Sequence, residues 1–131
     1  MSDSRTYSGD RLNMIAYPMG GIGAGMLCLE GTGAISHVSL RHKPDVRHEP
    51  QVLSALHIKQ PSGAAVARVL EGPVPRWKIF CQDGAGNGLH GKTYGLPRMK
   101  DASFSSRFPF ARIELRYPIQ DKARSRVMRG Q

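Results

Sequence analysis

The sequence has no apolar run long enough to cross a membrane, and its N-terminal residues lack the hydrophobic segment of a secretory signal. These two absences predict, by default, a cytoplasmic protein without a membrane span. Cysteine is also scarce. Cys28 and Cys81 are the only two, and they form neither a disulfide framework nor a CxxC motif. We expect two small, reduced, buried side chains, and a disulfide between them is the less favoured alternative.

Aromatic residues make up only 7% of the sequence, whereas glycine and proline are frequent, with 15 and 9 copies among 131 residues. This composition is typical of a chain rich in turns, in which long helices are hard to accommodate. The length suits one domain or part of one. The sequence therefore predicts an all-β fold of short antiparallel strands joined by turns.

Acidic residues are few relative to basic ones, and the formal net charge is +9. Much of this excess lies at residues 116–131, where five Lys and Arg residues face the single Asp121. Like-charge runs of this kind are usually solvated, so we expect a basic, disordered tail at 116–131. Aromatic residues do not alternate with the basic ones, as they do in proteins that bind single-stranded nucleic acid. Nucleic acid is therefore not an expected partner, and binding through the tail is a weaker alternative.

One glycine-rich stretch, residues 17–25, precedes the apolar run 26–30. A phosphate cradle needs glycines at the spacing GxGxxG or a P-loop lysine, followed by the start of a helix. Neither the spacing nor the helix is present, because residues 26–30 have the pattern of a strand. The glycines instead predict close packing of this backbone against another strand.

The rest of the chain is expected to form short strands and turns. Residues 1–13 are polar and predict a flexible lead-in. A first hairpin is expected from 26–30 and 34–40, and a second from 51–59 and 65–70. Further predicted elements are an extended proline-containing connector at 41–50, a short strand at 77–80 with Trp77 as core anchor, an irregular loop at 82–95 and a strand at 110–115.

No spacing in the sequence nominates a catalytic or metal site. A glycosidase needs two facing carboxylates, and the candidates are Glu30, Asp45, Glu49, Glu71, Asp83, Asp101 and Glu114. The histidines form no zinc-binding pattern, and they are His37, His42, His48, His57 and His90. We therefore predict no catalytic residue, no cofactor site and no metal site. Single aromatic faces that could stack on a sugar are Trp77, Tyr94 and Tyr117, although such residues more often belong to a core.

Several motifs in this order resemble the N-terminal domain of glycoside hydrolase family 116, which includes β-glucosidases of the non-lysosomal glucosylceramidase type. The similarity runs from Met14 to Leu115. It consists of residues 17–25 with the hairpin that follows, Glu49-Pro50, residues 55–59, residues 67–70 and Phe108-Pro109-Phe110-Ala111.

The resemblance implies a β-sandwich that packs on a helical (α/α)6 domain in a retaining β-glucosidase. In that family the helical domain supplies both catalytic carboxylates, so the resemblance assigns none here. We expect a truncated or frameshifted family member, with residues 14–115 as its sandwich portion and no activity of its own. Its expected partner is the helical domain, with a β-glucoside as the carbohydrate of the full-length enzyme. The alternative is a small carbohydrate-binding or protein-interaction β-module.

Overall fold

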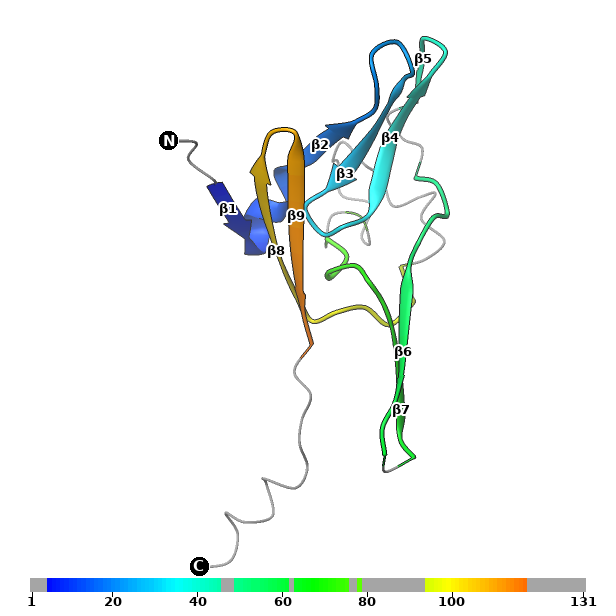
Figure 1. Cartoon of the computed structure of the whole chain (residues 1–131), viewed down its shortest axis with the longest axis vertical. Helices are drawn as coiled ribbons and strands as arrows, with labels where there is room; N and C mark the ends of the chain where they lie inside the picture. The colour runs from blue at the N-terminus through cyan, green and yellow to red at the C-terminus, as the bar shows by residue number, and fades with distance from the viewer. Residues whose placement is uncertain (1–4, 46–48, 62, 76–77, 79–93, 118–131) are drawn as a thin grey trace, which may run out of the picture.

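The chain is built from short antiparallel strands in a computed structural model that describes residues 5–45, 49–61, 63–75, 78 and 94–117 (Figure 1). This confirms the all-β fold class. In chain order the elements are β1 (Arg5–Ser8), the 3-10 helix η1 (Gly9–Met14), β2 (Ala16–Met19), β3 (Met26–Glu30), β4 (Ile35–Leu40), β5 (Lys43–Asp45), β6 (Ala55–Lys59), β7 (Ala65–Val69), β8 (Asp101–Arg107) and β9 (Phe110–Arg116).

The strands of the described residues form three sheets, with the orders β1-β8-β9, β2-β3-β4-β5 and β6-β7. The two hairpins predicted from the sequence are present as β3–β4 and β6–β7. β9 also matches its prediction, but its partner β8 was not predicted as a strand. The β6–β7 hairpin projects from the rest of the described chain as a two-stranded ribbon (Figure 1).

The sequence predicts a flexible lead-in at residues 1–13, but in the structure residues 5–14 form β1 and η1. β1 pairs antiparallel with β8, and Tyr7 lies opposite Phe104. Most side chains of β1 are exposed because it is an edge strand, so its polar composition gave no apolar alternation to detect. Within η1, Leu12 is buried and anchors the segment.

Other predicted boundaries also need correction. The connector predicted at 41–50 contains the short strand β5. The second predicted hairpin starts later than residue 51, because β6 begins at Ala55 and Val52 N–H instead donates a local hydrogen bond to the Pro50 carbonyl. Lys78 is helical, which contradicts the predicted strand at that position. The remainder of that strand, including Trp77, lies outside the described residues, as do most of the loop at 82–95 and residues 118–131.

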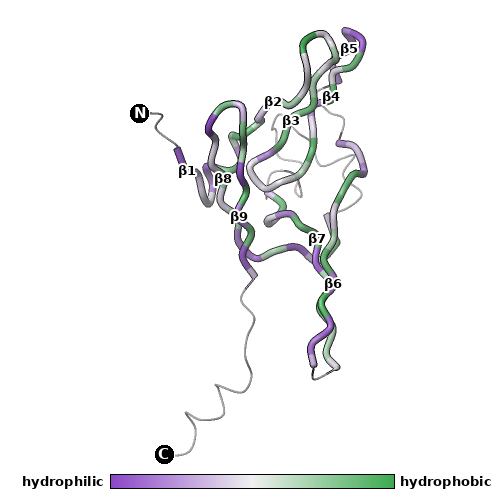
Figure 2. Tube along the Cα trace, viewed as in Figure 1, coloured by the Kyte–Doolittle hydropathy of each residue, from purple (hydrophilic) through white to green (hydrophobic). Residues whose placement is uncertain are grey.

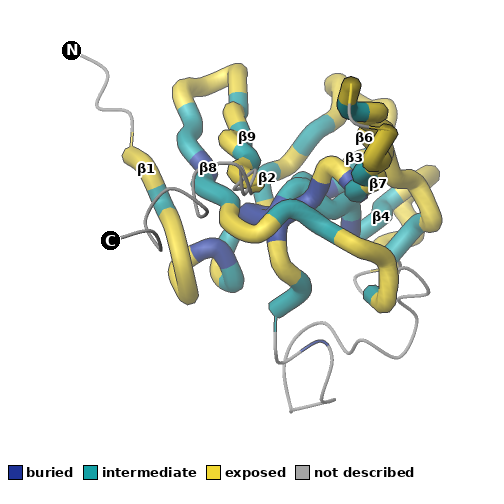
Figure 3. The backbone as a smooth tube through the Cα atoms, turned by 90° about the horizontal axis from the view of Figure 1, so that it is seen from below, coloured by how far each residue is buried: buried dark blue, intermediate teal, exposed yellow. Residues whose placement is uncertain are grey.

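The apolar core of the described residues is small. Its buried members are Leu12, Cys28, Val69 and Phe104, and the Phe104 ring lies 5.9 Å from that of Tyr17 on the neighbouring sheet. Burial concentrates in the middle of the molecule (Figure 3). Apolar residues also follow the β6–β7 ribbon (Figure 2), where every residue of β6 is exposed. Much apolar surface therefore remains uncovered.

Two glycines bring neighbouring backbones together. Gly25 has φ +96°, and a Cβ there would lie 2.5 Å from the Ser39 carbonyl oxygen of β4. This confirms the prediction that the glycine-rich stretch packs against another strand. Gly31, in the β3–β4 turn, would place a Cβ 2.6 Å from the carbonyl oxygen of Leu12. The turn can therefore contact η1 only because residue 31 has no side chain.

Gly31→Ala is expected to lower the free energy of unfolding by about 2 kcal/mol, because the new methyl group meets rigid backbone of η1. The matched control is Gly95→Ala, since no atom lies within 4 Å of a Cβ at Gly95. Chemical denaturation of both variants and the parent chain measures the difference. Equal stability of the two variants would contradict the proposed contact.

Candidate functional site: a buried lysine shared by two carboxylates

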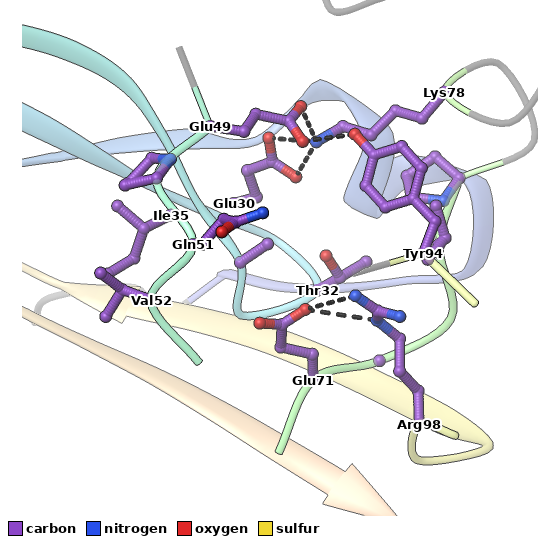
Figure 4. A pocket seen from close by; sticks show the side chains of 15 residues that line it. Glu30, Thr32, Ile35, Glu49, Gln51, Val52, Glu71, Lys78, Tyr94 and Arg98 are labelled. Atoms are coloured by element: carbon purple, nitrogen blue, oxygen red, sulfur yellow. Dashed lines mark hydrogen bonds and ion pairs between the residues drawn. The ribbon is translucent and has the colours of Figure 1, made fainter. Parts of the chain in front are cut away.

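The side chain of Lys78 is buried between two carboxylates, with only 3% of its surface exposed. Its Nζ donates to Glu30 Oε1 and Oε2 at 2.6 and 2.8 Å and to Glu49 Oε1 at 2.7 Å (Figure 4). Figure 4 shows both carboxylates pointing toward this one ammonium group. We call Lys78, Glu30, Glu49 and Tyr94 the Lys78 cluster.

Local structure explains why the two carboxylates turn inward. Glu30 ends β3, where Cys28 and Glu30 share the buried face by strand alternation. The following turn is fixed by a hydrogen bond from Glu30 N–H to the Ala34 carbonyl. Glu49 precedes Pro50, which favours an extended backbone at residue 49 and lets its side chain reach across to the same lysine. Segments far apart in the sequence thus meet at one cation.

Tyr94 completes the cluster, because its hydroxyl donates a hydrogen bond to Glu49 Oε2. Its ring centroid lies 5.9 Å from Lys78 Nζ, within the range of a cation–π contact. Burial first, and then the hydrogen bond and charge of Glu49, raise the pKa of Tyr94 well above its ordinary value of 10.0. The hydroxyl therefore remains a hydrogen-bond donor at neutral pH.

A second ion pair lines the same cavity as the Lys78 cluster. Arg98 Nε and Nη2 donate to Glu71 Oε2 at 3.3 and 3.1 Å, and both side chains are mostly buried. Backbone contacts place this pair: Arg98 forms a bridge with Val69, and Met99 N–H donates to the Glu71 carbonyl. The end of β7 is thereby held against the segment that leads into β8.

The cavity between these charges has a volume of about 30 Å³, which is enough for one or two water molecules. Small-molecule pockets are at least about tenfold larger. Glu30 Oε1 and Glu49 Oε1 lie 2.6 and 2.7 Å from the same Nζ, so these two oxygens are no farther apart than the about 5.5 Å that separates the carboxyl groups of retaining glycosidases. However, no sugar ring fits between them, and Lys78 neutralises their charge. This geometry is that of a structural ion cluster.

The structure brings together three of the seven candidate carboxylates, namely Glu30, Glu49 and Glu71, which all line the cavity. Asp45, Asp101 and Glu114 lie elsewhere, on β5, β8 and β9. Asp83 is outside the described residues. Sequence reasoning did not single out Lys78 or Arg98. The available signal was the position of Lys78 between Trp77 and Ile79-Phe80, because a lysine that is buried among apolar side chains needs a counter-ion.

The candidate histidines and cysteines do not form a metal site in the described part of the chain. Among the described residues, no group of three His, Cys, Asp or Glu side chains is placed to hold a metal ion. His37 shares a 2.6 Å hydrogen bond with Ser36 Oγ, whereas His48 and His90 lie outside the described residues. Cys28 is a free, buried thiol, and burial, with a smaller effect of Glu30, raises its pKa. Cys81 falls outside the described residues.

Two of the three aromatic faces proposed for sugar stacking already have cationic neighbours. Tyr94 lies beside Lys78, and the Tyr117 ring has the Arg68 guanidinium 4.7 Å from its centroid. Arg68 Nη2 also donates to the Tyr117 hydroxyl at 2.8 Å. Trp77 lies outside the described residues.

Comparison with known families bears on these observations. Residues 16–128 match the family model described as beta-glucosidase 2, glycosyl-hydrolase family 116 N-term. The chain belongs to this family. The resemblance stated from the motifs is thus confirmed, and the match extends beyond Leu115, where the sequence pattern predicted the end of the domain. No curated protein matches the chain. In the part of the family 116 chain that the structure describes, no helix is long and apolar enough to span a membrane.

Lys78→Met is expected to lower the free energy of unfolding by about 3–5 kcal/mol, because it leaves two buried carboxylates without their cation. The matched control is Arg112→Met. Arg112 pairs with Glu114 at the surface, where their side chains are 75% and 44% exposed, and loss of such a pair costs below about 1 kcal/mol. Urea denaturation measures both changes. Similar losses in the two variants would show that the Lys78 cluster does not support the fold.

Tyr94→Phe is expected to lower the free energy of unfolding by about 2 kcal/mol at neutral pH, since it removes a hydrogen bond to a carboxylate. Because the folded-state pKa of Tyr94 lies above its unfolded value of 10.0, the folded state holds more protons above pH 10. The stabilisation is therefore complete below pH 10 and is lost as the pH rises beyond it. The stability difference between parent and variant should shrink there. A difference that is constant from pH 7 to pH 11 would refute this role.

Proposed function

We propose that this chain acts as the non-catalytic N-terminal domain of a family 116 glycoside hydrolase and supports a helical (α/α)6 domain that carries the catalysis. The observation that carries the proposal is the Lys78 cluster. Its two carboxylates, Glu30 and Glu49, are neutralised by a buried lysine, and the cavity beside them is too small for a sugar. In this proposal the cluster fixes the shape of a scaffold, and the full-length enzyme acts on a β-glucoside.

The exposed apolar surface supports a docking role. On β6, Leu56 and Ile58 share one face and are 41% and 45% exposed, and Val52 nearby is 61% exposed. His57 and Lys59 occupy the opposite face by strand alternation. Isolated two-stranded ribbons are only marginally stable in water, and contiguous apolar surface often marks an interface. We assign the Leu56 and Ile58 face to contact with the helical domain.

The alternative, a small carbohydrate-binding β-module, has less support. Sugar stacking needs an open aromatic face, but Tyr94 and Tyr117 are engaged by Lys78 and Arg68. Glycan binding that is lost in Trp77→Ala, with the fold retained, would favour the module over the scaffold.

The scaffold role predicts that the chain binds a separately produced helical domain of a family 116 enzyme. The variant Leu56→Asp/Ile58→Asp should weaken this binding at least about tenfold, because charges would have to be desolvated at the interface. His57→Asp/Lys59→Asp on the opposite face serves as the control and should bind within about threefold of the parent. Isothermal titration calorimetry measures the affinities.

The same preparation tests the absence of catalysis. The chain alone should hydrolyse an aryl β-glucoside no faster than a buffer blank. Hydrolysis that tracks the protein through purification would refute the non-catalytic role. If both double variants weakened binding of the helical domain equally, the assignment of the Leu56 and Ile58 face to this contact would be refuted.

A further inference from the structure

Among the described strands, β9 has the longest open backbone edge. It is an outer strand of the sheet β1-β8-β9, and its ladder of seven residue pairs is made with β8 alone (Figure 1). The outer strands β2 and β5 of the neighbouring sheet contain Pro18 and Pro44, which interrupt edge pairing, whereas β9 has no proline. An edge of this kind favours the addition of another strand.

Alternate residues of β9 turn their backbone groups outward. Lys100 N–H donates to the Arg116 carbonyl at 3.0 Å, so the backbone groups of Arg116 face β8. Phe110 also faces β8, because it closes a two-residue turn with Arg107. Successive residues of an antiparallel strand point these groups to opposite sides. No other described backbone group is bonded to the outward-facing residues. These residues are Ala111, Ile113 and Leu115.

The half-buried face of β9 is complementary to itself when a second copy of the chain runs antiparallel to it. Along the strand, Ala111, Ile113 and Leu115 are half-buried and alternate with exposed residues. If Ile113 lies opposite the partner's Ile113, all seven residues of the strand are paired. Ala111 then lies opposite the partner's Leu115, a small side chain beside a large one. These pairs are the hydrogen-bonded ones, because their backbone groups point outward in both copies.

The exposed face of β9 is complementary in the same register. Arg112 lies opposite the partner's Glu114, at a non-hydrogen-bonded position where side chains approach closely. Within one copy Glu114 contacts Arg112 at 2.9 Å and Arg116 at 3.8 Å, but it is 44% exposed and a carboxylate accepts several hydrogen bonds. Phe110, which is 75% exposed, lies opposite the partner's Arg116, a cation beside an aromatic ring.

Other registers are less favourable. A slip of two residues puts Arg112 opposite the partner's Arg112 in one direction and Glu114 opposite the partner's Glu114 in the other. Like charges directly opposite each other destabilise a pair of strands. A slip of one residue puts outward backbone groups opposite groups that face β8, so the hydrogen bonds are lost. The charges and the backbone therefore select one register.

We propose that β9 pairs with β9 of a second copy of this chain, so that two three-stranded sheets join into one six-stranded sheet around a two-fold axis at Ile113. The interface is isologous, and each pair away from the axis occurs twice. It uses neither Leu56 nor Ile58, so the dimer does not depend on the docking face assigned to the helical domain.

Sedimentation equilibrium on the full chain tests the proposal. The parent should show a monomer–dimer equilibrium that depends on concentration. Arg112→Glu should raise the dimer dissociation constant at least about tenfold, because it creates two like-charge pairs across the interface. The reciprocal double variant Arg112→Glu/Glu114→Arg should return the constant to within about threefold of the parent, since opposite charges face each other again.

Arg5→Glu is the matched control. It changes the net charge by the same amount on β1, the opposite edge of the sheet, and should leave the dissociation constant within about threefold of the parent. Far-UV circular dichroism checks that each variant keeps its strands. Glu114→Arg alone should weaken the dimer as Arg112→Glu does, so the charge pair is tested from both sides.

Three results would overturn the proposal. One is a parent chain that stays monomeric at about 100 μM. Another is a folded double variant that remains as weak as Arg112→Glu, or a control that weakens the dimer equally. The third is a dimer that Leu56→Asp/Ile58→Asp abolishes and Arg112→Glu leaves intact, because the interface would then lie on the β6–β7 ribbon.

Discussion

The ion cluster around Lys78 is the interaction on which the arrangement of the sheets depends. One ammonium group holds Glu30, at the end of β3, and Glu49, in the connector that leads to β6. The neighbouring pair of Glu71 and Arg98 ties the end of β7 to the approach to β8. Desolvating these charges costs free energy, so the ion pairs add little net stability. Their main effect is specificity, because only one arrangement of the segments that carry them pairs every charge.

The small apolar core makes this constraint more important. Only four hydrophobic residues of the described chain are buried, and Leu56, Ile58 and Phe110 remain exposed. A domain that buries so little apolar area has a small free energy of unfolding. Partners that cover the exposed surface would therefore add much of its stability, in keeping with a scaffold that works against another domain.

Two surfaces of this family 116 domain invite contact for different physical reasons. On the β6–β7 ribbon, Leu56 and Ile58 present apolar side chains, which favour burial against any complementary apolar surface. On β9, the outward N–H and C=O groups, which have no strand partner among the described residues, offer a directional template for an extended backbone. The ribbon thus suits a separate folded domain, and the β9 edge suits a segment of extended chain.

By itself, the sequence determined the all-β fold class, the β3–β4 and β6–β7 hairpins, the close packing of the glycine-rich stretch and, through ordered motifs, the family. These features follow from local alternation, turn residues and glycine, which act over a few residues. The structure alone placed β1 against β8, because an exposed edge strand carries no apolar pattern. It also decided that Glu30, Glu49 and Lys78 meet. The spacing of these residues predicts nothing, since a buried ion cluster is created by the packing of segments that are distant in sequence.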